Sequence, residues 1–212
     1  MNDNFLQSVA IIVAHPDDET LWAGGTILIH HSWKCYIISL CRKNDSDRAP
    51  KFYKVLKILN ANGNMGDLDD EPEQKPLPDD EVEAAILELL PYSHFDIIIT
   101  HNPHGEYTKH LRHEETGNAV ISLWKAGKIS TNQLWIFAHE DGQSAYYPKA
   151  VENTSVYEVL ETSVWQQKYD IITNIYGFDK TSWEAQTTPK VEAFWQFSTA
   201  KEANDWLNKI NI

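Results

Sequence analysis

The 212-residue sequence predicts an α/β protein in which a mostly parallel sheet lies between two layers of helices. Short apolar runs typical of buried parallel strands alternate with segments of helical periodicity. The first run ends on a string of polar residues, His15 to Glu19, where a strand would give way to a helix. Such junctions are where open α/β sheets place their chemistry, so the same feature predicts both fold and site.

The first half of the chain supplies two strand–helix units. Residues 9–14 form a continuous apolar run that favours a buried strand, and the apolar residues over 21–29 continue as a helix. The glycine pair at 24–25 is unfavourable inside a helix, so we expect a close approach of this helix to the sheet. Residues 34–41 predict a second strand, and the apolar spacing over 52–59 predicts a second helix.

Residues 63–79 are predicted to form a loop, because glycine, proline and acidic residues replace the periodic pattern. The acidic string at 67–73 lacks the ligand spacing and central glycine of an EF-hand. A solvated loop is therefore favoured over a calcium site. Asp79 or Asp80 is expected to cap the next helix, which ends before Pro91.

The alternation of strands and helices continues along the chain. Residues 96–100 predict a third strand, 114–125 a helix and 133–138 a fourth strand. From about residue 142 the pattern weakens: one helix is predicted over 162–176, and the aromatic tail is left without assigned elements.

Residues 1–212 are expected to form one domain, since no linker is needed at this length. The net charge of −13 disfavours nucleic-acid partners, which bind clustered Lys and Arg. The N-terminal apolar run is too short for a signal peptide or membrane span, which predicts a cytoplasmic protein. Cys35 and Cys41 lie too far apart along one strand for a disulfide and are expected to be reduced. Eight tryptophans leave room for a homo-oligomer interface.

The sequence HPDDE at residues 15–19 is the first candidate for chemistry. His15 and Asp18 lie three positions apart across a proline-stiffened turn and can point at one cation, which leaves Asp17 free to act as a base. The alternative is a polar turn whose aspartates cap the following helix. Capping accounts for one aspartate and not for the whole string.

A second candidate follows the third predicted strand. Five of the nine histidines lie between His94 and His113. If His110 and His113 begin a helix, their spacing places both on one face, although such pairs are also common on solvated helices. Together with His15 and Asp18, one of the two would complete a three-ligand site with a vacancy for water, as a catalytic zinc site requires. Two nitrogens and a carboxylate suit ferrous iron equally well.

These two motifs, with Gly105-Glu106-Tyr107 between them, resemble the PIG-L/LmbE-like deacetylases over residues 8 to about 140. The resemblance implies a Rossmann-like fold and a divalent metal ion, usually zinc, and it assigns the ligands as His15, Asp18 and His113. It further implies that Asp17 is the general base and that His110 assists the tetrahedral intermediate or protonates the leaving amine. The residues expected to contact the substrate are Arg48, Glu106 and Tyr107.

The resemblance implies a reaction that removes an acetyl group from an N-acetylated amino sugar or a related small molecule. A metal-activated water would attack the acetamide, Asp17 would accept its proton, and a protonated His110 would stabilise the oxyanion. Two alternatives remain open at this stage: hydrolysis of another amide or acyl bond, and metal or sugar binding without catalysis. The second is disfavoured because metal binding does not need Asp17.

Overall fold

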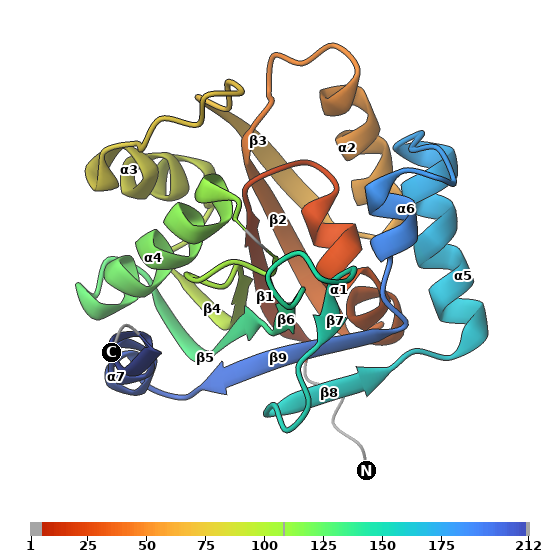
Figure 1. Ribbon diagram of the computed structural model, residues 1–212. Coiled ribbons are helices and arrows are strands. Elements are labelled where there is room, and N and C mark those ends of the chain that lie inside the picture. Colours follow the sequence, from red (N-terminus) through yellow and green to blue (C-terminus); the bar gives the residue numbers. More distant parts are fainter. Residues whose placement is uncertain (1–5, 108, 211–212) are drawn as a thin grey trace.

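The computed structural model describes residues 6–107 and 109–210, in which a seven-stranded sheet lies between two layers of helices (Figure 1). The first five strands across the sheet are parallel, and the last two pair antiparallel. In spatial order the strands are β3 (Asn62–Leu68), β2 (Trp33–Cys41), β1 (Gln7–Val13), β4 (His94–Thr100), β5 (Ser130–Phe137), β9 (Val191–Phe197) and β8 (Val156–Val159). This arrangement confirms the predicted α/β fold with a mostly parallel sheet.

The helices divide between the two faces of the sheet (Figure 1). One face is covered by α1 (Asp18–Ile29), α2 (Arg48–Ile58), α5 (Thr162–Asp170), its π-helical continuation η1 (Ile171–Ile175) and α6 (Trp183–Thr187). The other is covered by α3 (Asp79–Leu89), α4 (Leu111–Lys125) and α7 (Ala200–Ile210). A separate two-stranded sheet pairs β6 (His139–Glu140) with β7 (Lys149–Ala150).

The central strand β1 shows why the sheet needs both layers. Ile11 and Val13 pack in the core cluster beneath α1 and α2, whereas Ala10 and Ile12 pack in the cluster beneath α3 and α4. Successive side chains of a strand point to opposite faces, so a continuous apolar run is what a strand buried on both sides requires.

Three predictions about elements need correction or extension. The loop predicted over 63–79 is wrong at its start, because β3 occupies that stretch and pairs with β2. A Cβ atom on Gly63 would clash with the carbonyl oxygen of Ile37, so the glycine that suggested a loop permits close strand pairing instead. The N-cap of α3 is Pro78, not Asp79 or Asp80. In the tail, α5 and η1 realise the predicted helix, and β8 and β9 extend the sheet.

The glycine pair of α1 does mark a close approach, but the neighbour differs from the one expected. A Cβ atom on Gly25 would lie 2.3 Å from a methyl carbon of Leu160, which follows β8. A Cβ atom on Gly24 would lie 3.2 Å from Thr20 and 3.5 Å from Lys168 of α5. The glycines therefore make room for side chains of the C-terminal segment rather than for the sheet.

Two expectations about covalent and membrane properties can be compared with the structure. Cys35 and Cys41 are both buried and free, as predicted. Among the described residues, no helix combines the length and the apolar character needed to cross a membrane.

The order of the strands also places the functional motifs. β1 pairs with β2 on one side and with β4 on the other, so the chain direction across the sheet reverses at β1. In open α/β sheets, ligands bind in the crevice at the carboxyl ends of the strands flanking such a point. The connections from β1 to α1 and from β4 to α4 meet there, and they carry the HPDDE and histidine-rich motifs.

Candidate metal centre and its pocket

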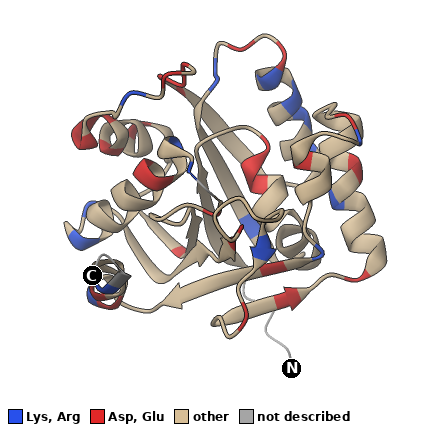
Figure 2. Ribbon diagram, viewed as in Figure 1, with Lys and Arg blue, Asp and Glu red and all other residues tan. Residues whose placement is uncertain are grey.

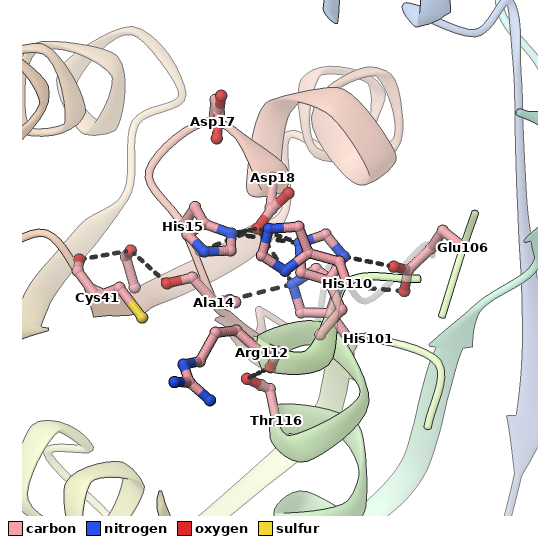
Figure 3. Close-up of polar contacts among 12 residues, drawn as sticks. Ala14, His15, Asp17, Asp18, Cys41, His101, Glu106, His110, Arg112 and Thr116 are labelled. Atoms are coloured by element: carbon pink, nitrogen blue, oxygen red, sulfur yellow. Dashed lines mark hydrogen bonds and ion pairs between the residues drawn. The ribbon is translucent and has the colours of Figure 1, made fainter. Parts of the chain in front are cut away.

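Side chains from the two motifs, among them His15, Asp18 and His110, lie close together at the ends of β1 and β4 (Figure 3). His15 Nδ1 lies 3.1 Å from Asp18 Oδ2 and 3.2 Å from His113 Nε2, and the latter two atoms are 3.3 Å apart. Ligands held at about 2.0–2.1 Å by one tetrahedral zinc ion stand about 3.3 Å from one another. These three atoms therefore have the spacing of a ligand set.

Local structure explains why the ligands meet. His15 lies in the tight turn after β1, where its backbone N–H donates to Asp18 Oδ2 at 2.9 Å, and Asp18 begins α1. His110 is the N-cap of α4 and His113 lies in its first turn, so the expected helix start is observed. Two strand-to-helix junctions thus supply one ligand set.

The wider cluster offers other ligand combinations. The ligand atoms of His15, His110 and His113 lie within 4.8 Å of one another, and so do those of Asp18, His101 and His113. The residues therefore fit a divalent metal ion, and the chemistry of the donors does not by itself choose zinc over ferrous iron.

Glu106 holds one of the ligands from behind. Its Oε2 lies 2.7 Å from His113 Nδ1, and its Oε1 lies 3.1 Å from His101 Nδ1 and accepts the Asn102 N–H at 2.7 Å. Burial opposes ionisation, but the imidazoles of His101 and His113 hold the pKa of Glu106 well below its usual range. Because Glu106 is fully buried and its oxygens are engaged, the expected substrate contact does not fit its position. It instead orients His113 so that Nε2 faces the centre.

Asp17 stands apart from the ligands, above His15 and Asp18 in Figure 3. Its Oδ2 accepts a hydrogen bond from Arg48 Nη1 at 3.0 Å. Burial, together with the charge of Asp18, raises the pKa of Asp17 to about 7, even though Arg48 acts in the opposite direction. A carboxylate with such a pKa is suited to accept and return a proton near neutral pH.

His110 lies beside the ligands, with ring centroids 4.4 Å from His113 and 4.6 Å from His15. Burial, then the neighbouring imidazoles, lower the pKa of His110 to about 3. This lowered pKa favours a neutral His110 ring over the protonated one that the sequence-based mechanism expects. A neutral imidazole can still donate a hydrogen bond through its one N–H.

A pocket of about 420 Å³ opens over these groups, a volume suited to a small molecule. Arg48 and Tyr107 line it, whereas Glu106 does not. Trp183 and Glu184 of α6 form part of its wall, and the Trp183 ring lies 4.6 Å from that of Tyr107. The C-terminal part of the chain, which had no predicted role, thus contributes to the pocket.

Asp70 is a further site residue that sequence reasoning missed. Its Oδ1 lies 3.1 Å from His15 Nε2, and its Oδ2 accepts a hydrogen bond from Arg42 Nε at 2.7 Å. The solvated loop expected over 67–73 is therefore wrong for this residue, whose side chain is 7% exposed. Burial opposes the shift, but His15 and Arg42 lower the pKa of Asp70 to about 2. A carboxylate in an acidic string carries no signal that separates it from solvated neighbours.

The sequence over residues 10–124, just over half of the chain, matches the sequence model described as PIG-L, GlcNAc-PI de-N-acetylase. The α/β fold and the candidate His/Asp metal-binding groups are consistent with a family of metal-dependent enzymes. The chain is a member of the PIG-L family. No curated protein sequence matches it.

Solved structures share the fold at low sequence identity. The 4-carboxy-2-hydroxymuconate hydratase of Pseudomonas putida superposes with a TM-score of 0.60 at 16% identity, covering 90% of this chain and 95% of that one. A conserved protein of Thermus thermophilus gives 0.57 at 16% identity, covering 89% and 94%. A deacetylase of teicoplanin biosynthesis gives 0.55 at 14% identity, covering 80% and 84%. At these identities the likeness concerns the fold alone.

Proposed function

We propose that this protein is a metal-dependent hydrolase that removes the acetyl group from an N-acetylated amino sugar or a related small molecule. The observation that carries the proposal is the mutual 3.1–3.3 Å spacing of His15 Nδ1, Asp18 Oδ2 and His113 Nε2 at the base of a pocket. Membership of the PIG-L family supports the same reaction. Zinc is the proposed metal, and ferrous iron or another divalent ion suits the same donors.

The proposed mechanism assigns proton transfer to Asp17. His15, Asp18 and His113 would hold a divalent metal ion, which when bound would lower the pKa of a water molecule and polarise the acetyl carbonyl. Asp17, held by Arg48, accepts the proton of the attacking water. His110, being neutral, donates a hydrogen bond to the carbonyl oxygen as negative charge develops there. Asp17 then passes its proton to the departing amine nitrogen, giving acetate and a free amine.

The pocket wall supports a polar, weakly charged substrate. Arg48 and Tyr107 are proposed to contact the hydroxyls of the sugar, and Trp183 offers a ring on which a pyranose face can pack. Figure 2 shows Lys and Arg along α2, whereas acidic residues crowd the start of α3 and the segment before it. Because Arg48 is already paired with Asp17, a polyanionic substrate finds little uncompensated positive charge at the metal centre.

The fold alone does not choose the reaction, since one structural neighbour is named a hydratase and another a deacetylase. The experiment is an acetate-release screen of zinc-loaded protein against N-acetylated sugars, sugar nucleotides and thiol glycosides. We expect release from at least one amino sugar, and a loss of about 10²- to 10⁴-fold in kcat in Asp17→Asn with its zinc retained. If acetate were released only from acetylated lysine peptides, the proposal of a metal-dependent hydrolase would stand and the proposal of an amino-sugar substrate would be rejected. No release from any amide, with zinc bound, would favour the non-catalytic alternative.

A further inference from the structure

The segment from Asp69 to Leu77 lies against the start of α4, close to both motifs. Leu77 N–H donates to Glu115 Oε1 at 2.9 Å, and Leu111 N–H donates to Gln74 Oε1 at 3.3 Å. The Gln74 amide also lies 3.2 Å from His110 Nε2. These contacts join the segment to the same helix turn that carries His110 and His113.

Arg112, between those two histidines, makes the strongest attachment. Its side chain is 2% exposed, and its Nε and Nη2 donate to the carbonyl oxygens of Asp69 at 2.5 Å and of Lys75 at 2.8 Å. Its Nη1 pairs with Glu115 Oε2 at 2.5 Å. One guanidinium thus binds both ends of the stretch that contains Asp70, and hydrogen bonds from a charged donor are stronger than those between neutral groups.

Asp70 is the residue that this attachment delivers to the metal centre. One carboxylate oxygen faces His15 Nε2, and the other is held by Arg42. A histidine that donates its Nε2–H to a carboxylate keeps Nδ1 free of a proton, and Nδ1 is the nitrogen that faces Asp18 and His113. Glu106 does the same for His113 with the opposite pair of nitrogens.

We propose that Asp70 is a positioning residue for the metal centre, which orients His15 through Nε2 and is held in place by Arg112 and Arg42. The inference rests on the metal site of the proposed function, but it does not depend on the substrate. Each of the two imidazole ligands is then oriented by a carboxylate. Glu106, from the connection before α4, orients His113, and Asp70, from a segment that no sequence motif marks, orients His15.

Zinc affinity tests the proposal without any substrate. Competition with a chromophoric chelator gives the dissociation constant of Zn²⁺ for the full chain and its variants. Asp70→Asn preserves shape but loses the charge, and we expect zinc to bind roughly 10- to 100-fold more weakly. Glu73→Gln removes the same charge from an exposed position on the same segment and is expected to leave the affinity unchanged. Equal affinities in Asp70→Asn and the native protein would overturn the proposal.

Arg112→Lys tests the anchoring, since lysine cannot reach both carbonyl oxygens and Glu115 together. We expect weaker zinc binding and faster hydrogen–deuterium exchange over residues 69–77, although Arg112 touches no ligand atom. In the zinc-loaded native protein, nitrogen NMR should find His15 protonated at Nε2; a proton on Nδ1 would also overturn the proposal. If no substrate released acetate but Asp70→Asn weakened zinc binding, the proposed substrate would be rejected and this inference kept. If acetate were released but Asp70→Asn bound zinc as tightly as the native protein, the proposed function would stand and this inference would be rejected.

Discussion

At the scale of the residue, Asp17 adopts a strained backbone conformation that places its carboxylate in the pocket. Its φ of 134° lies in a region that side chains other than glycine rarely adopt, and its carboxyl group is buried next to Asp18. Backbone strain of this kind costs on the order of 1–3 kcal/mol and persists only where surrounding structure enforces it. Here the turn between β1 and α1 enforces it, and the result is a carboxylate aimed into the pocket beside the ligands.

Asp17→Asn is expected to stabilise the metal-free protein near neutral pH. The raised pKa of about 7 means that between about pH 4 and pH 7 the folded state holds a proton that the unfolded state, near 3.8, has released. The free energy of unfolding therefore falls as pH rises through this window, by at most about 1.4 kcal/mol for each pH unit. Asparagine removes this dependence. Urea denaturation at pH 5 and pH 8 in chelator should show the variant's advantage growing with pH; a constant difference would contradict it.

His113→Ala is expected to lose bound zinc, whereas His110→Ala should keep it. His113 Nε2 faces both His15 and Asp18 at 3.2–3.3 Å, but His110 is held by Gln74 and lies to one side. Elemental analysis of the two purified variants measures this directly. Full metal content in His113→Ala would transfer the ligand role to His110, which the shared cluster of histidines would permit.

Individual site residues differed in how far sequence could place them. His15, Asp18, His110 and His113 could be brought together because each motif follows a buried strand of a parallel sheet. Asp70 could not, since its role depends on the fold of a segment, residues 69–77, whose sequence is acidic and contains two prolines. Arg112, which anchors this segment, lies inside a motif, but the local sequence does not show which carbonyl oxygens it binds.

At the scale of the element, a buried ion pair joins α1, α5 and β9. Lys168 Nζ lies 2.6 Å from Glu192 Oε1, and both side chains are fully buried. Glu192 also accepts the N–H groups of Gly25 and Thr26, at 2.8 and 2.6 Å, and the Thr26 hydroxyl at 2.6 Å. The carboxylate thus has a donor for each oxygen, which is the condition under which a buried charge is tolerated.

Lys168→Met is expected to lower the free energy of unfolding by about 3–5 kcal/mol, because the buried Glu192 would lose its ionic partner. Replacing Lys201, whose pair with Asp205 is exposed, should leave stability unchanged. Thermal or urea denaturation compares the two. Replacing both Lys168 and Glu192 with apolar residues should recover part of the loss, and no recovery would show that the backbone N–H groups need Glu192.

Strands and helices were predictable where their pattern was strong. The apolar runs of β1, β2 and β4 are buried on both faces, so composition alone identified them. β3 was not recognised, because its sequence NGNMGDL has the composition of a turn and owes its extended form to pairing with β2. β8 alternates in burial at the sheet edge, a weaker pattern over only four residues.

At the scale of the whole molecule, the antiparallel strands β9 and β8 join the C-terminal part to the parallel sheet. The last of the parallel strands, β5, pairs directly with β9, so the sheet continues without a break across the region that sequence could not order. A single domain over residues 1–212 and a homo-oligomeric state both stay predictions. The sequence alone could not assign elements to this C-terminal part, because β9 forms by pairing with β5, a contact between residues about 60 positions apart along the chain.

The C-terminal part also bears on substrate choice, because Trp183 and Glu184 lie outside residues 10–124 yet line the pocket. Trp183→Ala removes a ring that packs on Tyr107 and faces the cavity, so we expect KM for an amino-sugar substrate to rise while zinc content stays unchanged. A stacking contact of this size is worth about 1 kcal/mol, or roughly fivefold in KM. Trp183→Phe keeps an aromatic face and should retain most of the affinity. Steady-state kinetics on the zinc-loaded variants measures both, and a fall in kcat with unchanged KM would place Trp183 in catalytic positioning rather than in substrate binding.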